Sequence, residues 1–171
     1  EVRTTSLENL ESDTLAVLSN LNHASQKGLQ TIFDSSVGRS TVNQPIGGRY
    51  QMTPSESSVQ KLPVQRGVTK TASVIAQGFN PYIAEWSPYH GAAYAVIEAT
   101  ARLVATGANW SQSRFSYQEY FQRMDKQADR FGQPVSALLG SIEAQIQLGL
   151  PSIGGKDSMS GTFEELTVPP T

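Results

Sequence analysis

Cysteine is absent from this 171-residue chain, and histidine is almost absent. The lack of cysteine excludes disulfides, thiolate nucleophiles and cysteine metal sites. The two histidines, His23 and His90, do not fall at a metal-ligand spacing. No Gly-x-Ser-x-Gly segment occurs, so no nucleophile elbow supports a serine hydrolase. The sequence therefore offers none of these three chemistries.

Charge of either sign is in short supply, and long apolar runs are missing. Lys and Arg number 13 against 15 Asp and Glu, which leaves a net charge of -2. This balance predicts no nucleic-acid partner, because no basic surplus faces a phosphate backbone. No run of about 18 apolar residues predicts a membrane span, and no apolar segment follows Glu1 as in a secretory signal. We expect a cytoplasmic protein.

The length and composition fit one globular domain. The 14 Gly and 9 Pro are an ordinary share, and 38% of the residues are hydrophobic. The chain begins without Met and ends at Pro169-Pro170-Thr171, so we expect a piece of a longer protein. We divide it into a helical connector, residues 1–34, and one partial domain, residues 35–171.

Residues 5–21 predict a helix, with apolar side chains at helical spacing. Thr5 and Glu8 have the spacing of a capping box. A shorter helix is predicted over 23–33, interrupted at Gly28. We expect this region to pack on another part of a protein. The predicted apolar stripe is Leu7, Leu10, Val17, Leu18 and Leu21.

Residues 35–69 are rich in Ser, Thr, Gln, Gly and Pro, which favours loops. Short apolar pieces such as 59–64 are candidate strands, and β-branched residues predict a strand over 70–79. A helix follows, because Ser87 is a good N-cap and Pro88 suits the first helical position. The run 92–105 is apolar almost all round, which predicts burial against a sheet and another helix. Gly107 supplies the left-handed end.

The C-terminal third predicts a second helix and further extended pieces. Residues 116–123 predict a strand end or a short helix, and 134–148 predict a helix that starts at Pro134 and ends before Gly149. The predicted apolar stripe of this helix is Leu138, Leu139, Ile142, Ile146 and Leu150. The order of elements predicts an α+β or α/β domain with helices packed on a sheet.

The segment 153–161 is the sharpest candidate for binding. Gly154 and Gly155 let backbone approach a ligand closely, and successive N–H groups of such a turn form an anion-binding nest. Lys156 adds a positive charge and Ser158 a donor. The segment is not a Walker A loop, because Asp157 stands where that motif has Ser or Thr. The alternative is a flexible Gly/Ser turn.

Three other positions carry candidate chemistry. Glu98 is the only charge within 92–101, and Arg102 stands four residues on. The plain explanation is an intrahelical ion pair, and the alternative is a metal ligand. His90 is expected to pack or cap in its first turn. Most aromatics of 115–121 are expected in the core, with Gln118 and Glu119 as candidates to face a site.

Four segments, residues 78–98, 115–121, 138–145 and 154–161, together resemble phosphoribosylformylglycinamidine synthase. The resemblance runs from about His23 to the C-terminus and covers only part of that enzyme. It is to the second of two related ATPase-like halves, which folds like the N-terminal domain of aminoimidazole ribonucleotide synthetase. The resemblance therefore implies a two-layer α+β fold with helices on one face of a sheet.

The resemblance also implies an activity. The family uses ATP to phosphorylate the formamide oxygen of formylglycinamide ribonucleotide, and ammonia from glutamine then displaces the phosphate. It implies ATP and Mg²⁺ as cofactors, and the remaining domains of the enzyme, including the glutaminase, as partners. Because those domains are absent, we expect the isolated chain to be inactive. Its uncovered sheet edges predict a homodimer.

Residue by residue, the resemblance places nucleotide or substrate-phosphate contacts at Gly154, Gly155, Lys156, Asp157, Ser158, Gln118 and Glu119, and a metal ligand at Glu98. Lys156 stands where the family has an Asn near nucleotide and metal. Arg102 replaces an Asn that ligates metal in the family, and Tyr117 falls near a family Asp. An alternative therefore stays open, in which this half is structural and completes a pseudo-symmetric core.

Overall fold

The computed structural model describes residues 6–33 and 40–170. Contacts divide the chain into two compact units, Glu1–Arg39 with Gln44–Pro54, and Ser40–Asn43 with Ser55–Thr171. This partition differs from the predicted boundary after residue 34, because Gln44–Pro54 belongs with the N-terminal unit.

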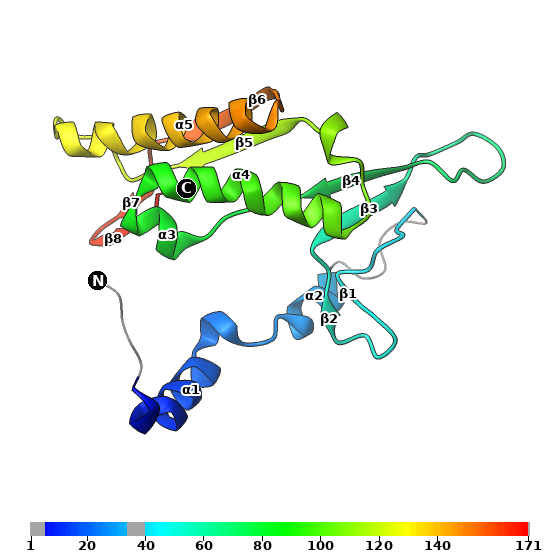
Figure 1. Ribbon diagram of the computed structural model, residues 1–171, viewed down its shortest axis with the longest axis horizontal. Coiled ribbons are helices and arrows are strands. Elements are labelled where there is room, and N and C mark those ends of the chain that lie inside the picture. The colour runs from blue at the N-terminus through cyan, green and yellow to red at the C-terminus, as the bar shows by residue number, and fades with distance from the viewer. Residues whose placement is uncertain (1–5, 34–39, 171) are drawn as a thin grey trace. The chain divides into compact units, whose positions relative to one another are not determined.

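The N-terminal unit consists of short helices and one small hairpin (Figure 1). Its elements are η1 (Leu7–Asn9), α1 (Leu10–Ser19), η2 (Leu21–His23), α2 (Lys27–Phe33), β1 (Ile46–Gly47) and β2 (Thr53–Pro54). Both predicted helices are confirmed, although Gly28 lies inside the first turn of α2 and does not interrupt it. The predicted capping residue Thr5 lies outside the described residues.

The apolar stripe predicted for the first helix is not buried. No residue of α1 is buried. Leu7, Leu10, Val17, Leu18 and Leu21 are 53–90% exposed. Helical spacing thus predicted the helix correctly, but nothing within the described residues covers its apolar side chains.

The second unit carries the larger fold. Its elements are β3 (Ser57–Lys61), β4 (Ala72–Ala76), α3 (Pro81–Trp86), α4 (Pro88–Ala105), η3 (Trp110–Gln112), β5 (Phe115–Tyr120), α5 (Ala128–Leu148), β6 (Ser152–Ser158), β7 (Thr162–Phe163) and β8 (Leu166–Thr167). The predicted mixed α+β class is confirmed. The described strands pair two by two: β3 and β4 antiparallel, and β5 and β6 parallel with α5 as the crossover.

Helix boundaries follow local signals at most ends. Ser87 caps α4 by accepting from the His90 N–H, Pro88 follows it, and Gly107 has a φ of +87°. Gly149 ends α5 with a φ of +66°. The predicted start of α5 is wrong, because the helix begins at Ala128 and Pro134 lies buried inside it. The proline removes one helical hydrogen bond there without ending the helix.

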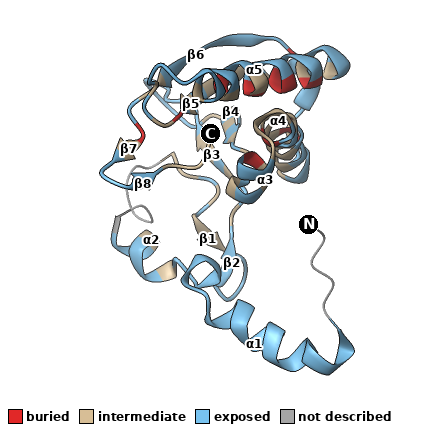
Figure 2. Cartoon of the chain, turned by 90° about the vertical axis from the view of Figure 1, so that its left-hand side faces the viewer, coloured by how far each residue is buried: buried red, intermediate tan, exposed pale blue. Residues whose placement is uncertain are grey.

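α4 and α5 pack through small side chains. The buried residues of α5 are Pro134, Ala137, Gly140, Ser141 and Ala144, and they colour one side of that helix in Figure 2. A Cβ on Gly140 would lie 2.0 Å from the Tyr89 carbonyl oxygen, so only glycine permits this crossing. Phe121, Val96 and Leu150 complete the core with Ala84.

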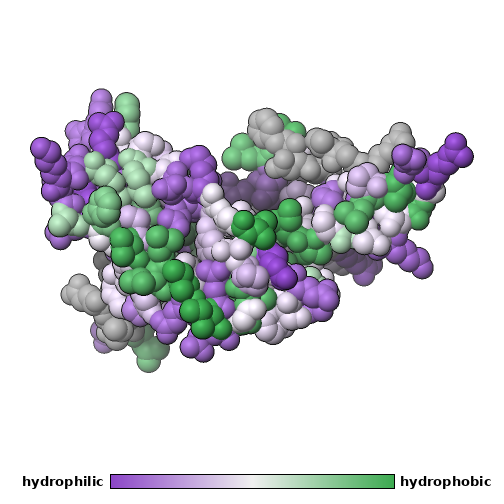
Figure 3. All heavy atoms as spheres, turned by 90° about the horizontal axis from the view of Figure 1, so that it is seen from above, coloured by the Kyte–Doolittle hydropathy of each residue, from purple (hydrophilic) through white to green (hydrophobic). Residues whose placement is uncertain are grey.

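The predicted stripe of the second helix is therefore mostly wrong. Leu150 is buried at 3% exposure, but Leu138, Leu139, Ile142 and Ile146 are 43–72% exposed. The small residues form the interface between α4 and α5 because they let the two helix backbones approach closely. Figure 3 shows green apolar side chains on the face seen from above, where α5 lies. No described helix has the length and apolar character to cross a membrane.

Candidate functional site

The predicted Gly-rich loop is a β-strand. Residues Ser152–Ser158 form β6, which pairs in parallel with β5 so that Gln118 lies opposite Lys156. The prediction of a turn is wrong, because the segment after α5 adopts extended backbone and forms hydrogen bonds with β5. Alternate N–H groups of β6 bond to β5, so consecutive amides do not converge as an anion nest requires.

Both glycines of this strand have local structural reasons. A Cβ on Gly155 would lie 2.6 Å from the Tyr117 carbonyl oxygen, closer than real side chains approach. Gly154 has a φ of +149°, and it lies where the register with β5 shifts between Phe115 and Ser116. Strand packing at Gly155 and a bulge-like irregularity at Gly154 thus explain why both positions are glycine. The sequence had assigned these two glycines to ligand contact.

Three predicted site residues lie together on the exposed face of the β5–β6 pair. Gln118 Nε2 donates to the Lys156 carbonyl oxygen at 3.2 Å. Lys156 Nζ donates to Ser158 Oγ at 2.5 Å. An ammonium, an amide and a hydroxyl are therefore neighbours, and all three can donate hydrogen bonds to an anion.

Two other predicted residues lie on the opposite face. Side chains alternate along a strand, so Glu119 and its register partner Asp157 point away from Lys156 and Ser158. Burial and, second, the charge of Asp157 raise the pKa of Glu119. Burial and then Glu119 raise the pKa of Tyr117 to about 12. The predicted contact set is thus divided between two faces.

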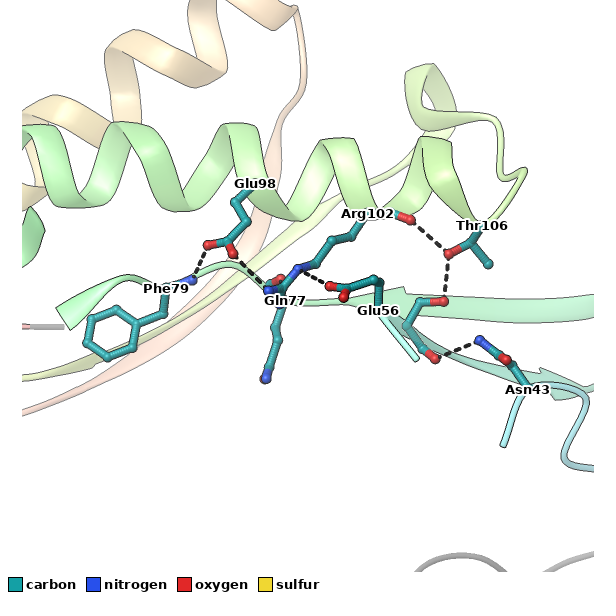
Figure 4. A network of polar contacts seen from close by, with 8 residues as sticks. Asn43, Glu56, Gln77, Phe79, Glu98, Arg102 and Thr106 are labelled. Carbon is teal, nitrogen blue, oxygen red and sulfur yellow. Dashed lines mark hydrogen bonds and ion pairs between the residues drawn. The ribbon is translucent and has the colours of Figure 1, made fainter. Parts of the chain in front are cut away.

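Glu98 and Arg102 form the intrahelical ion pair expected from their spacing (Figure 4). The distance from Arg102 Nη2 to Glu98 Oε1 is 2.8 Å, and the Phe79 N–H donates to Glu98 Oε2 at 2.9 Å. Arg102 also donates to the Gln77 carbonyl oxygen at 2.8 Å and pairs with Glu56 Oε2 at 2.9 Å. Sequence reasoning missed Glu56, which lies just before β3 in a region predicted as loop.

The metal alternative for Glu98 finds no support in its surroundings. Both carboxylate oxygens already accept hydrogen bonds. Within residues 6–33 and 40–170, no three His, Cys, Asp or Glu side chains gather as metal ligands would. His90 packs and caps as expected, since its Nδ1 lies 2.8 Å from Ser87 Oγ and its ring contacts Trp86 and Tyr89.

A hollow of about 710 Å³ lies along β4, α4 and β5 in the second unit. Apolar and small side chains of α4, including Ala95 and Ala99, line it together with Tyr117 and Ser113. Sequence reasoning did not predict this hollow. Its sequence signal is the spacing of small residues every four positions along α4, at Gly91, Ala95 and Ala99.

No family model matches the chain, and no curated protein matches it. Several solved structures do match this chain. PurL complexed with AMPPCP, from Thermotoga maritima, is 17% identical with a TM-score of 0.63, over 89% of this chain and 23% of that one. From the same organism, phosphoribosylformylglycinamidine synthase II and PurL complexed with ATP are each 18% identical, with TM-scores of 0.51, over 67% of this chain and 18% of theirs.

The chain thus spans about a fifth of the length of these solved proteins. The resemblance predicted from the four sequence segments is confirmed at the level of the fold. This chain has the mixed α+β architecture found in part of the T. maritima synthase chains.

Proposed function

We propose that this chain is part of a glutamine-dependent, ATP-driven carbon–nitrogen ligase that converts formylglycinamide ribonucleotide to formylglycinamidine ribonucleotide. The observation that carries the proposal is the fold likeness to PurL over 89% of the chain. Of the segments with sequence resemblance, 115–121 contains β5 and 154–161 overlaps the C-terminal part of its partner β6. The sequence resemblance therefore includes part of the paired strands of this fold.

Within that enzyme we assign the exposed face of the β5–β6 pair to a phosphate group of substrate or nucleotide. Lys156 supplies a compact positive charge, and Gln118 and Ser158 supply neutral donors beside it. Hydrogen bonds between an ammonium and phosphate oxygens are stronger than those between neutral groups. Phosphoryl transfer needs charge neutralisation and alignment more than covalent catalysis, and these side chains offer that.

The described residues do not fit Mg²⁺. Glu98 is occupied by Arg102 and the Phe79 N–H, and Lys156 stands where a metal ligand would be needed. No step of the proposed reaction therefore depends on a metal bound by this chain. ATP is proposed for the complete enzyme because a T. maritima PurL with the same fold was solved with ATP.

A second function is favoured by specific contacts. Gly155 packs on Tyr117 and Glu98 joins α4 to the Phe79 backbone, so residues that resemble a ligand site also hold the fold together. In this alternative the chain is a structural half that completes a pseudo-symmetric synthetase core and contacts no ligand.

Calorimetric titration of the complete enzyme with formylglycinamide ribonucleotide and with ADP and Mg²⁺ separates the two functions. If the exposed face binds phosphate, Lys156→Ala lowers the affinity for one of these ligands about tenfold or more, which corresponds to a binding free energy of about 1.4 kcal/mol. Ser158→Ala weakens it by about 1.5–3 kcal/mol, the value of a hydrogen bond to a charged group. Lys126→Ala, at another exposed lysine, is the matched control and leaves both affinities unchanged.

Unchanged affinities in Lys156→Ala and Ser158→Ala, together with a lowered unfolding midpoint, establish the structural alternative. Amidation of the ribonucleotide by the isolated 171-residue chain, with ammonia and ATP supplied, contradicts the proposal that further domains are required.

A further inference from the structure

Large aromatic side chains are exposed where α3 meets α4. Tyr82 is 58% exposed, Trp86 70% and Tyr94 57%. Glu85 and His90 lie among them and are also exposed. We call these five residues the aromatic corner. Trp and Tyr are the residue types that most often carry binding energy at protein interfaces, so this surface has the composition of a binding surface.

Two capped helices support the aromatic corner. Asn80 caps α3 by accepting from the Tyr82 N–H at 3.0 Å, and Ser87 caps α4. A Cβ on Gly91 would lie 2.6 Å from the Ala84 Cα, so the two helices pack closely there. Figure 1 shows α3 beside the N-terminal part of α4. Side chains on such a preorganised support lose little conformational freedom when they bind a partner.

The rings form one surface across the two helices. The Trp86 and His90 ring centroids are 5.1 Å apart. Ser87 Oγ lies 2.8 Å from His90 Nδ1, which orients the imidazole. Tyr94 follows His90 by four residues, so the two side chains are neighbours on α4. The aromatic surface therefore continues from α3 onto α4.

The charge near this surface has one sign. Within residues 71–101, the charged side chains are Glu85 and Glu98. Glu98 pairs with Arg102 at 2.8 Å. Glu85 forms no ion pair with any residue of 6–33 or 40–170. The aromatic corner thus combines ring faces with one uncompensated carboxylate.

A guanidinium matches both features. Aromatic faces attract cations, and arginine stacks on them more often than lysine does. The planar guanidinium also donates paired hydrogen bonds to a carboxylate. An anionic partner would be repelled by Glu85. A purely apolar partner would bury that carboxylate without a counter-charge, which is costly.

We propose that the aromatic corner binds an arginine-bearing segment of a partner protein. The guanidinium contacts the Tyr82 and Trp86 rings and the Glu85 carboxylate, which lie three and four residues apart on one face of α3. His90 and Tyr94 extend the contact along α4. The surface uses other elements than the β5–β6 face and takes a cation instead of a phosphate, so the proposal does not depend on the ligase activity.

Calorimetric titration of the 171-residue chain at low salt tests the proposal. The probe is an acetylated, amidated peptide of about seven residues that alternates serine and arginine. One control peptide carries citrulline, which keeps the shape of arginine without its charge, and another carries lysine. We expect the arginine peptide to bind about fivefold or more tightly than the lysine peptide. The citrulline peptide should show no saturable binding.

Substitutions locate the binding. Trp86→Ala and Glu85→Gln should each lower the affinity for the arginine peptide about fivefold or more. Glu143→Gln, at an exposed carboxylate of α5, changes the net charge equally and should leave the affinity unchanged. In a Trp110→Phe chain, Trp86 is the only tryptophan, and its fluorescence should change on binding. Should Trp86→Ala fail to fold by circular dichroism, Glu85→Gln decides the question.

Four results overturn the proposal. Equal affinities for the arginine and lysine peptides mean simple charge attraction. An affinity that is unchanged in folded Trp86→Ala or in Glu85→Gln places the binding elsewhere. An equal loss in Glu143→Gln means that net charge alone controls binding. A change in Trp86 fluorescence that appears without peptide and rises with chain concentration means that a second copy occupies the aromatic corner.

Discussion

Arg102 connects three separate parts of the second unit. It contacts Glu98 within α4, the Gln77 carbonyl oxygen after β4, and Glu56 before β3. Its side chain is 29% exposed, so solvent screens these charges only in part. The guanidinium thereby attaches the β3–β4 hairpin to the helix, together with the 2.6 Å hydrogen bond between Ser57 Oγ and Thr106 Oγ1.

Arg102→Ala is expected to lower the free energy of unfolding by about 1–3 kcal/mol, because several charge-assisted hydrogen bonds are lost together. Urea unfolding followed by circular dichroism measures the change. Arg66→Ala, at an exposed arginine, serves as the control and should leave the midpoint in place. Equal effects of the two changes would show that the Arg102 contacts contribute nothing to stability.

Gly155 is a second position where the addition of one carbon atom is expected to change stability. Gly155→Ala places a Cβ 2.6 Å from the Tyr117 carbonyl oxygen, so β5 and β6 must move apart. We expect a loss of about 1–3 kcal/mol of stability, as for other overpacked sites. Gly132→Ala in α5 meets nothing within 4 Å and should stabilise by up to about 1 kcal/mol. Thermal unfolding of both variants gives the comparison.

Glu119 makes stability depend on pH in a defined direction. Its pKa is raised above the ordinary value of 4.5 by burial and by Asp157. A carboxyl with a raised pKa stabilises the fold while it is protonated, and this contribution is lost as the pH rises through the folded-state pKa. Glu119→Gln should therefore raise the melting temperature near neutral pH and change it little below pH 4.5. A stabilisation that is larger in acid would contradict the assigned burial of the charge.

At the scale of elements, local signals predicted the helices, although not the start of α5, and predicted β4 (Ala72–Ala76) within 70–79 but not β6. The Ser87-Pro88 pair and Gly149 identified helix ends because caps act through neighbouring residues. β6 was missed because its strand character depends on β5, 38 residues away. The inner face of α5 was missed because its buried residues are mostly small, with Gly140 against the Tyr89 backbone, while hydrophobicity indicated the leucines.

The candidate site was predictable only in part for the same reason. Gln118, Lys156 and Ser158 were identified by residue type and resemblance, and the parallel register brings them together. That Glu119 and Asp157 lie on the opposite face from these three residues could be predicted only by knowing that both segments are strands. The Glu98–Arg102 pair was predicted from a spacing of four, but Glu56 joins it from a distant segment that carries no such spacing.

At the scale of the whole chain, exposed apolar surface is the dominant feature. Large apolar residues are exposed on α1, including Leu18 at 70%, and on α5, including Ile146 at 72%. Exposed apolar side chains of this size favour association, and the net charge of -2 opposes it little. The homodimer expected from the sequence remains a prediction.

We expect the isolated chain to self-associate as its concentration rises, most simply as a twofold dimer. Light scattering across a concentration series measures this directly. Leu139→Glu and Ile146→Glu on the exposed side of α5 should shift the equilibrium toward monomer, whereas Glu143→Gln on the same helix should not. A monomer that persists at about 0.1 mM would disprove self-association at these surfaces.

The parallel pairing of β5 and β6 also sets the order of folding events. Its partners are 38 residues apart in the chain, whereas Ser73 and Gln60 of the β3–β4 hairpin are 13 apart. Closing the longer loop costs more chain entropy and must await α5, which bridges the two strands. In pulse-labelled refolding, the amides of β4 should therefore become protected before those of β6, so the face with Lys156 and Ser158 is among the last parts of the chain to form.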